Sequence, residues 1–275
     1  MKSRFAVVGA VAAALALALS GCSGGAAGAG SNATASTAAA SGSADLVAAR
    51  TNGLVIGTEG TYRPFSYHDA TTNKLTGYDI DVTNAVAKQL GIKVTFQETQ
   101  WDGIFAALDS KRIDVIANQV SITPERQAKY SFSTPYTVSP GVIITRADDK
   151  SITSFADLKG KTTAQSNTSD WYALAQKNGA NVQAVEGWAQ SIALLTQGRI
   201  DATVNDKLTL LDYEKQHPEA KLRIAATAAD PAKNAFTFRK SSTLAPDFDK
   251  ALATLAANGT LAKISEKYFG QDVSK

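Results

Sequence analysis

Polar residues suited to ligand binding follow two apolar stretches of the chain. Asn118 and Gln119 come after the first stretch, and Asn205 and Asp206 come after the second. In open α/β sheets, ligands bind beyond the carboxyl ends of the strands. We therefore expect these residues to form two walls of one ligand site, with the Asp206 carboxylate suited to an ammonium group. Alternatively, Asp206 is the N-cap of a helix that begins near Lys207.

Arg126 is the candidate for binding a carboxylate. Residues 121–126 read Ser-Ile-Thr-Pro-Glu-Arg, in which Thr123 is a good N-cap and Pro124 a good first helical residue. Arg126 then lies in the first helical turn, near free backbone N–H groups, and its guanidinium offers two parallel hydrogen bonds to a carboxylate. Alternatively, Arg126 pairs with Glu125 or faces solvent.

Three aromatic residues, Tyr62, Phe65 and Trp101, lie beside predicted transitions from strand to loop. Aromatic rings at such positions are suited to enclose the apolar part of a small ligand or to face a cation. Aromatic side chains are also typical of a hydrophobic core. Both interpretations stay open for each of the three.

The candidate residues lie in and around an internal repeat. Residues 101–119 read WDGIFAALDSKRIDVIANQ and residues 188–206 read WAQSIALLTQGRIDATVND, and seven of the nineteen positions are identical without a gap. Each copy predicts a helix, a tight turn, a buried strand and a polar pair just past the end of the strand. Two such units predict two similar lobes that face one cleft.

Strands that alternate with helices predict an α/β chain with largely parallel sheets. The apolar patterns predict strands near residues 54–56, 92–97, 113–118 and 142–145, and helices near residues 82–90 and 168–177. Gly91 is placed to end the first of these helices. Ser154 with Asp157 predicts a capping box, and Pro246 predicts the first turn of a C-terminal helix.

The composition argues against several classes of function. The chain has 28 basic and 25 acidic residues and no run of more than two basic residues, which argues against nucleic-acid binding. Its two histidines and single cysteine argue against a zinc or haem site, so we expect no metal and no cofactor. The sequence has no H-E-x-x-H motif, and we expect a protein that is not an enzyme.

Residues 1–21 have the pattern of a secretory signal, with Lys2 and Arg4 before an apolar run and small residues. The tetrapeptide Leu-Ser-Gly-Cys that ends at Cys22 resembles the lipobox of bacterial lipoproteins. The resemblance implies cleavage before Cys22, lipidation of Cys22 and a location at the extracytoplasmic face of the cell membrane. Alternatives are an ordinary signal peptide with a chance cysteine and an uncleaved anchor, although an apolar run of roughly fifteen residues is short for a transmembrane helix.

Residues 23–49 consist almost entirely of Gly, Ala, Ser and Thr. Such a segment buries too little apolar surface to offset the entropy lost on ordering. We therefore expect residues 22–50 to be a lipidated cysteine followed by a flexible linker. Its reach is roughly 25–30 Å, from the square-root scaling of flexible chains.

Eight segments of the globular part together resemble the family 3 solute-binding proteins, the polar-amino-acid-binding proteins of bacterial ABC importers. The segments are TYRPFSY (61–67), LTGYDIDV (75–82), WDGIFAALDSKRIDVI (101–116), SITPER (121–126), FSTPY (132–136), FADLKGK (155–161), GRIDATVND (198–206) and GTLAKISEKYFG (259–270). The resemblance implies a two-lobed periplasmic-binding-protein-like fold of type II with a two-strand hinge. It implies a lobe 1 of residues 51–143 plus 238–275 and a lobe 2 of residues 144–237.

The resemblance also implies how the amino-acid group of a ligand is held. Arg126 would bind the α-carboxylate, helped by Ser121 and by a backbone N–H near Thr168. Asp206 would bind the α-ammonium group, helped by the backbone of residues 118–119. The implied site therefore holds a zwitterion between one cationic and one anionic side chain.

The ligand side chain would lie between Tyr62 and Trp101, and Glu59 matches an acidic position that contacts a cationic side chain in some relatives. The second lobe resembles the cystine-binding branch of the family in AQSNTSDW (164–171), VEGWAQSIALL (185–195), VNDKLTLLDY (204–213) and AFTFRK (235–240). It departs from the common pattern at residues 166–168, where Ser-Asn-Thr replaces Gly-Thr-Thr. Cystine is the expected ligand, with glutamine or a basic amino acid as alternatives.

The resemblance further implies that the protein delivers its ligand to an ABC transporter permease, and we expect a monomer. Two other functions stay open. One is a periplasmic dehydratase-like enzyme on the same fold, for which Glu59 is the candidate general acid or base. The other is a receptor module that presents the ligand to a sensor, since a fold by itself does not fix a function.

Overall fold

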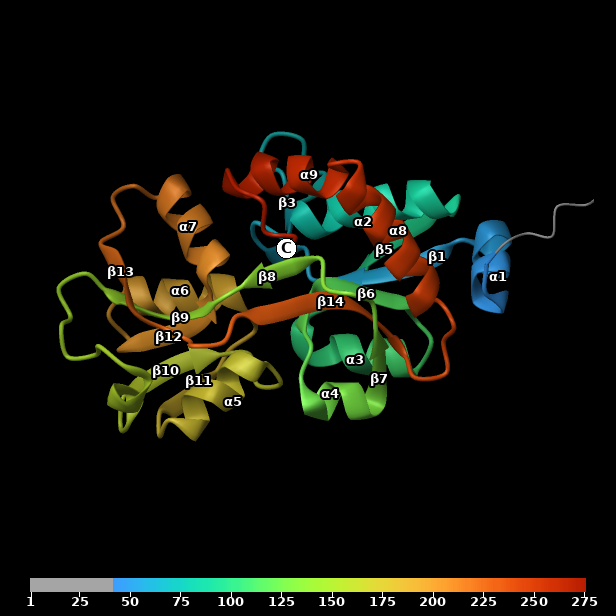
Figure 1. Cartoon of the computed structure of the whole chain (residues 1–275). Helices are drawn as coiled ribbons and strands as arrows, with labels where there is room; N and C mark the ends of the chain where they lie inside the picture. Colours follow the sequence, from blue (N-terminus) through green and yellow to red (C-terminus); the bar gives the residue numbers. More distant parts are fainter. Residues whose placement is uncertain (1–41) are drawn as a thin grey trace, which may run out of the picture. The chain divides into compact units, whose positions relative to one another are not determined.

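The computed structural model describes residues 42–275, which are built on two large β-sheets (Figure 1). Residues 1–41 lie outside the described part, and with them the predicted signal and the predicted lipidation site at Cys22. Within the described part, no helix has the length and apolar character needed to cross a membrane. We call the part built on the first sheet lobe 1 and the part built on the second sheet lobe 2.

Lobe 1 contains a six-stranded sheet in which three parallel strands are joined by antiparallel ones. The strands are, in spatial order, β5 (Val94–Glu98), β1 (Leu54–Thr58), β6 (Val115–Ser121), β14 (Ala232–Arg239) and β7 (Tyr130–Phe132), with β8 (Thr137–Ser139) also paired to β14. A three-stranded sheet accompanies it and consists of β2 (Thr61–Tyr62), β3 (Ser66–His68) and β4 (Leu75–Thr76).

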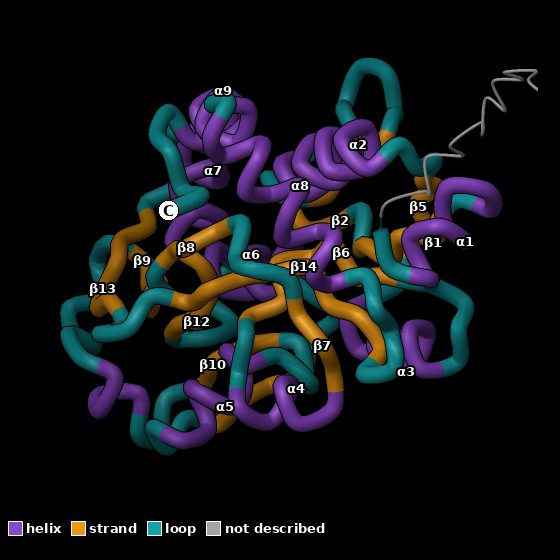
Figure 2. The backbone as a smooth tube through the Cα atoms, turned by 45° about the vertical axis from the view of Figure 1, so that its right-hand side comes forward, coloured by secondary structure: helices purple, strands orange, loops and turns teal. Residues whose placement is uncertain are grey.

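Helices cover both faces of the lobe 1 sheet (Figures 1 and 2). One face carries α2 (Tyr78–Leu90), α8 (Ala245–Ala257) and α9 (Thr260–Phe269), and the other carries α3 (Trp101–Asp109) and α4 (Pro124–Lys129). Side chains of a strand alternate between the two faces of a sheet. Val115 and Ala117 of β6 therefore belong to the core under α2 and α8, whereas Ile116 and Val120 belong to the core under α3.

Lobe 2 repeats this arrangement around a five-stranded sheet. The strands are, in spatial order, β11 (Asn181–Ala184), β10 (Thr162–Gln165), β12 (Ala202–Asp206), β9 (Gly141–Arg146) and β13 (Leu222–Thr227), of which the first three are parallel. Its helices are α5 (Asp170–Lys177) on one face, α6 (Trp188–Thr196) and α7 (Lys207–Gln216) on the other, and a 3₁₀ helix at Phe155–Leu158. The predicted α/β class with two lobes is confirmed.

The signals for helix ends are also confirmed. Gly91 has a left-handed φ of 69° and ends α2, as its position in the sequence predicts. Ser154 and Asp157 form the predicted capping box at the 3₁₀ helix. Pro246 lies in the first turn of α8.

The chain crosses between the two sheets earlier than predicted. β8 leads through Pro140 into β9, and β13 leads through residues 228–231 into β14. The predicted boundaries after residues 143 and 237 lie inside β9 and β14, so both boundaries need correction. Each predicted boundary falls within one strand, and the local sequence of a strand does not reveal which of two sheets it joins.

The N-terminal boundary of the fold also needs correction. Residues 44–52, most of which the sequence assigned to a flexible linker, form helix α1 (Ala44–Asn52). Ser43 caps this helix, and Leu46 and Ala49 are buried. Asp45 accepts a hydrogen bond from the backbone N–H of Thr243 at 2.8 Å. A short helix takes most of its stability from tertiary packing, which local composition does not reveal.

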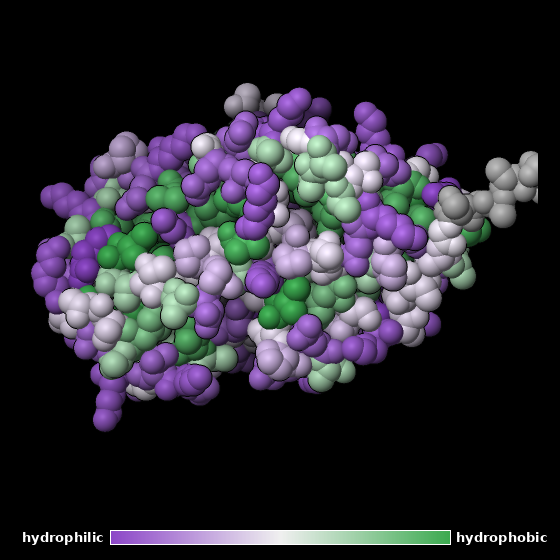
Figure 3. Space-filling view, in the orientation of Figure 1, coloured by the Kyte–Doolittle hydropathy of each residue, from purple (hydrophilic) through white to green (hydrophobic). Residues whose placement is uncertain are grey.

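Polar residues cover much of the face shown in Figure 3, and apolar residues on it form small separate groups. Among residues 42–275, the large hydrophobic side chains that stay exposed are Val47 of α1 and Leu211 of α7. Val47 is 42% exposed, whereas its neighbour Leu46 is 2% exposed. The two adjacent residues therefore provide a matched pair for testing whether α1 belongs to the fold.

The substitution Leu46→Ala is expected to lower the free energy of unfolding by about 2–5 kcal/mol, because it removes buried side-chain atoms between α1 and lobe 1. Val47→Ala is expected to change it by less than about 0.5 kcal/mol, since the side chain is largely exposed. Urea denaturation followed by circular dichroism measures both values. Equal effects of the two substitutions would show that α1 is not packed as described.

Candidate functional site

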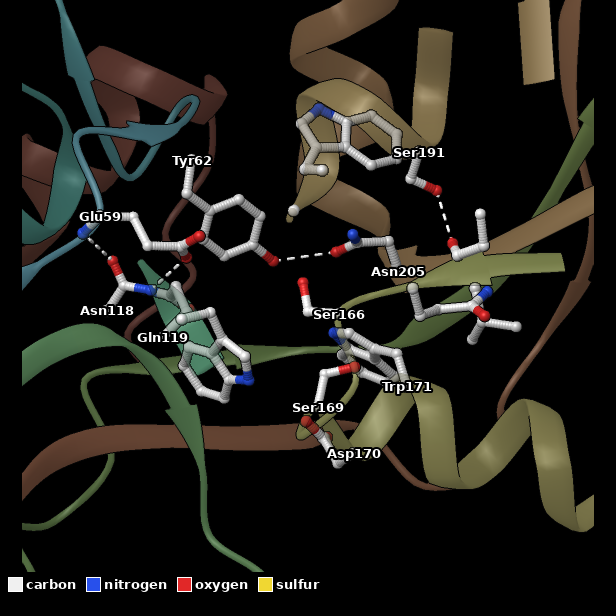
Figure 4. Close-up of a pocket in the computed structure, with 16 residues that line it drawn as sticks. Glu59, Tyr62, Asn118, Gln119, Ser166, Ser169, Asp170, Trp171, Ser191 and Asn205 are labelled. Carbon is white, nitrogen blue, oxygen red and sulfur yellow. Dashed lines mark hydrogen bonds between the residues drawn. The ribbon is translucent and has the colours of Figure 1, made fainter. Parts of the chain in front are cut away.

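A cavity lies between the two lobes (Figure 4). Lobe 1 contributes Glu59, Tyr62, Trp101, Asn118 and Gln119 to its lining. Lobe 2 contributes Ala164, Gln165, Ser166, Ser169, Asp170, Trp171, Gly187, Trp188, Ser191, Val204 and Asn205. Five of the ten site residues predicted from the sequence therefore line one cavity.

The internal repeat explains how both lobes contribute matching groups. Trp101 begins α3 and Trp188 begins α6, and both line the cavity. Asn118 of β6 and Asn205 of β12 are also equivalent in the repeat, and both line it. Trp188 is a wall residue that was not predicted from the sequence, although its equivalence to Trp101 was a usable signal.

The polar pairs of the repeat lie inside their strands and not past them. β6 continues through Asn118 and Gln119 as far as Ser121, and β12 includes both Asn205 and Asp206. The prediction that the first strand ends at Asn118 is therefore wrong. Polar side chains tolerate a strand position here because they face the cavity or other buried polar groups.

Asn118 fixes the position of Glu59. The Oδ1 atom of Asn118 accepts a hydrogen bond from the backbone N–H of Glu59 at 2.8 Å, and its Nδ2 donates to Oε2 of Glu59 at 2.6 Å. Burial raises the pKa of Glu59 to about 7. The carboxyl also reaches lobe 2, since a Cβ atom on Gly187 would lie 3.2 Å from Oε1 of Glu59.

Tyr62 crosses the cavity from lobe 1 to lobe 2. Its hydroxyl donates a hydrogen bond to Oδ1 of Asn205 at 2.9 Å (Figure 4). Phe65 packs against the Tyr62 ring with centroids 5.1 Å apart, but it is fully buried in the core of lobe 1. The structure therefore places Phe65 behind the cavity wall, where it supports Tyr62.

Asp206 is buried at the end of β12 beside the cavity-lining Asn205. Its Oδ1 accepts hydrogen bonds from Oγ of Ser139 at 2.6 Å and from the backbone N–H of Leu208 at 2.8 Å. Asp206 is therefore the N-cap of α7, as one of the two sequence interpretations expected. Its Oδ2 has no hydrogen-bond partner within the described chain, and burial raises the pKa of Asp206 to about 6.

Arg126 lies behind two residues that line the cavity. Its guanidinium donates to the backbone oxygen of Ser121 at 3.1 Å, to that of Thr168 at 3.4 Å and to Oδ1 of Asp170 at 3.4 Å. It also lies 5.2 Å from the centre of the Trp101 ring. The side chain is only 11% exposed, so neither Glu125 nor bulk solvent is its main partner.

Thr168 is held by the other lobe. Its backbone N–H and its hydroxyl both donate to Oδ1 of Asp102, at 3.0 and 2.7 Å. The resemblance assigns the backbone N–H near Thr168 to a ligand carboxylate, whereas here the Thr168 N–H bonds to the Asp102 carboxylate of α3. Together with the Arg126 contacts, this bond joins α3 and α4 of lobe 1 to the start of α5 in lobe 2.

Most residues of the lobe 2 wall were not predicted from the sequence. Ser166, Ser169, Asp170 and Trp171 line the cavity, and all four lie in the segment AQSNTSDW that carried the resemblance to the cystine branch. Ser169 is also the N-cap of α5, since its hydroxyl accepts a hydrogen bond from the backbone N–H of Tyr172 at 3.0 Å. A strand followed by a capped helix was the available signal for this part of the site.

The cavity is suited to a small zwitterion. It has carboxyl groups at Glu59 and Asp170, a guanidinium behind it at Arg126, and aromatic rings on both walls. Among residues 42–275, no group of three or more His, Cys, Asp or Glu side chains is arranged to hold a metal ion.

Known proteins similar to this chain are amino-acid-binding proteins. The L-cystine-binding protein TcyA of Bacillus subtilis is 53% identical over 223 residues, which are 81% of this chain and 83% of that protein. The L-cystine solute receptor of Neisseria gonorrhoeae, solved in an unliganded open conformation, is 45% identical with a TM-score of 0.58 and coverage of 86% and 100%. An ancestral arginine-binding protein bound to arginine is 36% identical with a TM-score of 0.74 and coverage of 79% and 98%.

The family model for bacterial extracellular solute-binding proteins, family 3, matches residues 54–271. This range contains both sheets and every residue that lines the cavity. The chain belongs to the family 3 bacterial extracellular solute-binding proteins.

Proposed function

We propose that this protein binds L-cystine and delivers it to the permease of an ABC importer. The observation that carries the proposal is the cavity between the lobes, which has aromatic walls and the carboxyl groups of Glu59 and Asp170, with the Arg126 guanidinium behind it. The named similarity to two cystine-binding proteins supports the same ligand.

One amino-acid end of the ligand requires a cation and an anion. Arg126 is the proposed cation, and its contact with Asp170 at 3.4 Å is long enough for a ligand carboxylate to compete with it. Asp206 is the proposed anion, because its buried Oδ2 lacks a partner that an ammonium group would supply. Ser121 and Thr168 take supporting roles, since their backbone oxygens orient the Arg126 guanidinium.

Cystine has a second amino-acid end beyond its disulfide. Glu59 is the proposed acceptor for the second ammonium group, and the pairing would favour the ionised carboxylate. The disulfide would lie among the rings of Tyr62, Trp101 and Trp188, which line the cavity. Divalent sulfur packs favourably against aromatic rings, so these walls suit a disulfide.

Other ligands and an enzymatic role are the alternatives. A basic amino acid would also suit Glu59, and one similar structure is of a protein bound to arginine. A dehydratase-like reaction would require a general acid or base, and the raised pKa of Glu59 makes it the candidate group. The named relatives are described as binding proteins, which supports a role in transport.

We further propose that the lobes close on the ligand by bending at the two strand crossings. Two contacts that join the lobes support this idea, the Tyr62–Asn205 hydrogen bond and the Arg63–Asp212 ion pair, both at 2.9 Å. The TM-score is lower with the open cystine receptor than with the arginine-bound protein, although the open receptor has the higher identity. A ligand that contacts both lobes shifts such an equilibrium toward the closed form.

A further proposal concerns how the N-terminus holds the protein at the outside of the cell. We infer that Cys22 carries lipid, so that the monomeric protein stays at the extracytoplasmic face of the membrane near its permease. The support is the Leu-Ser-Gly-Cys sequence after an apolar run.

Calorimetry with L-cystine, L-arginine, L-histidine and L-glutamine tests the proposed ligand. The expected result is tightest binding of L-cystine, because only this ligand fills both polar ends. Tighter binding of L-arginine than of L-cystine would show that the ligand is a basic amino acid. Turnover of any of these compounds by the purified protein would contradict a pure binding role.

Removal of the proposed cation is expected to weaken cystine binding strongly. Arg126→Ala deletes a buried group that pairs with the ligand carboxylate, a loss that typically costs about 2–5 kcal/mol. Arg112→Ala, at an exposed arginine of the same lobe, is the control and is expected to bind normally. Calorimetry measures affinity and circular dichroism checks the fold. A loss of less than about tenfold, or 1.4 kcal/mol, would remove Arg126 from the site.

The affinity for cystine is expected to rise between pH 6 and pH 8. Glu59, with a pKa of about 7, is mostly protonated at the lower pH and mostly ionised at the higher one, and an ammonium group binds the ionised form. Relative to Glu59→Gln, the wild-type affinity should rise by about tenfold, in proportion to the ionised fraction. The ratio of the wild-type affinity to the Glu59→Gln affinity cancels the titration of the ligand, Asp206 and Asp79, which both proteins share. Parallel pH profiles of the two proteins would contradict the role of Glu59.

Loss of the proposed lipid is expected to release the protein from the membrane. Cys22→Ala removes the sulfur to which lipid would attach, whereas Ser23→Ala leaves it in place. Membrane fractionation followed by immunoblotting measures the distribution of both variants. A Cys22→Ala protein that stays with the membranes would show that another segment anchors the chain.

A further inference from the structure

Asp79 is a buried carboxylate that has no role in the predicted site or in the proposed ligand contacts. It is the second residue of α2 and is fully buried. Its Oδ2 accepts a hydrogen bond from the backbone N–H of Gln119 at 3.0 Å, and its Oδ1 accepts one from Nε2 of Gln119 at 2.6 Å. Gln119 lines the cavity, whereas Asp79 lies behind it.

Gln119 has an irregular backbone within β6. Its φ of 50° lies in the left-handed region, which a residue with a side chain adopts when its surroundings hold it there. The pairing of β6 with β14 shifts beside it, because Val120 opposes Ala235 while Ile116 opposes Thr237. β6 therefore carries additional residues at this point, and such bulges redirect side chains and leave backbone groups without a strand partner. The α2 carboxylate accepts the backbone N–H of the bulged residue.

The side chain of Gln119 also bonds to both strands that lead to the other lobe. Its Nε2 donates to Oγ1 of Thr137 at 3.1 Å, and its Oε1 accepts from Nδ2 of Asn234 at 2.9 Å. Thr137 lies in β8 shortly before the crossing at Pro140. Asn234 lies in β14 shortly after the crossing at residues 228–231. One buried amide group is thus connected to α2 and to both crossings.

We propose that Asp79 is a positioning residue for ligand binding, because its two hydrogen bonds hold the bulge of β6 on the two crossing strands. The bulge presents Asn118 and Gln119 to the cavity, and Asn118 in turn fixes Glu59. Loss of the carboxylate therefore disturbs the lobe 1 wall without removing any group that touches the ligand. This inference rests on the proposed function, since the affinity for L-cystine is its readout.

The variant Asp79→Asn retains the size of the side chain and removes one of its two acceptors. The new amide hydrogens then face a donor of Gln119, so the bulge loses one bond and gains a repulsion. Thr83→Val is the matched control. Thr83 is a buried polar residue of the same helix, and its hydroxyl donates to the backbone oxygen of Asp79 at 2.6 Å. It makes no contact with the bulge through its hydroxyl and should affect stability alone.

A double variant, Asp79→Asn with Gln119→Glu, restores the lost complementarity. The amide at position 79 keeps an oxygen for the backbone N–H of residue 119, and its hydrogens donate to the new carboxylate. The other oxygen of that carboxylate accepts from Asn234 as before, while the Thr137 hydroxyl turns to donate. The total charge of the network is unchanged, so recovery of binding reports on the hydrogen-bond pattern.

Calorimetry with L-cystine is carried out on the full chain at a temperature where circular dichroism shows each variant folded. Asp79→Asn is expected to weaken binding by about tenfold or more. The double variant is expected to bind within about threefold of wild type, because the effects of substitutions at contacting residues are not additive. Thr83→Val is expected to lower the melting temperature and leave the affinity unchanged.

Three results would overturn the role of Asp79: normal binding by Asp79→Asn, an equal loss of affinity in Thr83→Val, or no recovery in the double variant. If Asp79→Asn does not fold, the double variant decides, because a folded double variant with near wild-type affinity supports the proposal and an unfolded one contradicts it. A wild-type protein that binds no L-cystine would instead contradict the proposed function.

Discussion

The fold is organised around the two strand crossings between its sheets. Within the described residues, the chain passes between the sheets at Pro140 and at residues 228–231, and β8 and β14 run side by side there (Figure 1). Backbone bonds fix their far ends to lobe 2, from the N–H of Lys207 to the oxygen of Pro140 at 3.0 Å and from the N–H of Ala228 to the oxygen of Gly141 at 2.8 Å. Two adjacent short connections are links about which lobes can rotate as units, and the proposed closure on the ligand relies on them.

Buried charge sets the chemistry of the site. Glu59, Asp79 and Asp206 are carboxyl groups whose burial raises their pKa values, because removing a charge from water costs free energy. Each is held by hydrogen bonds from amide, hydroxyl or backbone donors. A ligand ammonium group offsets part of this cost, so these acidic groups favour a ligand with positive charge. Arg126 provides the opposite sign behind the cavity wall, where it pairs with Asp170.

The repeat gives the two walls a common construction. In each lobe a helix begins with a tryptophan that lines the cavity, and the strand that follows carries an asparagine that lines it too. The lobes differ in what these two asparagines contact. Asn118 holds the Glu59 carboxyl, whereas Asn205 accepts the Tyr62 hydroxyl from the opposite lobe. Similar units therefore supply the same scaffold with different polar contacts.

Local periodicity, turn chemistry and recognisable segments were sufficient to predict the α/β class, the repeat, the helix ends at Gly91 and Pro246, and five residues of the cavity wall. Other features are visible only in the folded chain, namely the crossing points, the packing of α1, the burial of Phe65 and the continuation of β6 through its bulge. The contact between Asp79 and Gln119, forty residues apart, is another of these features. They could not be predicted because pairing between distant segments sets burial, register and the partner of each buried polar atom, and a linear pattern carries none of these.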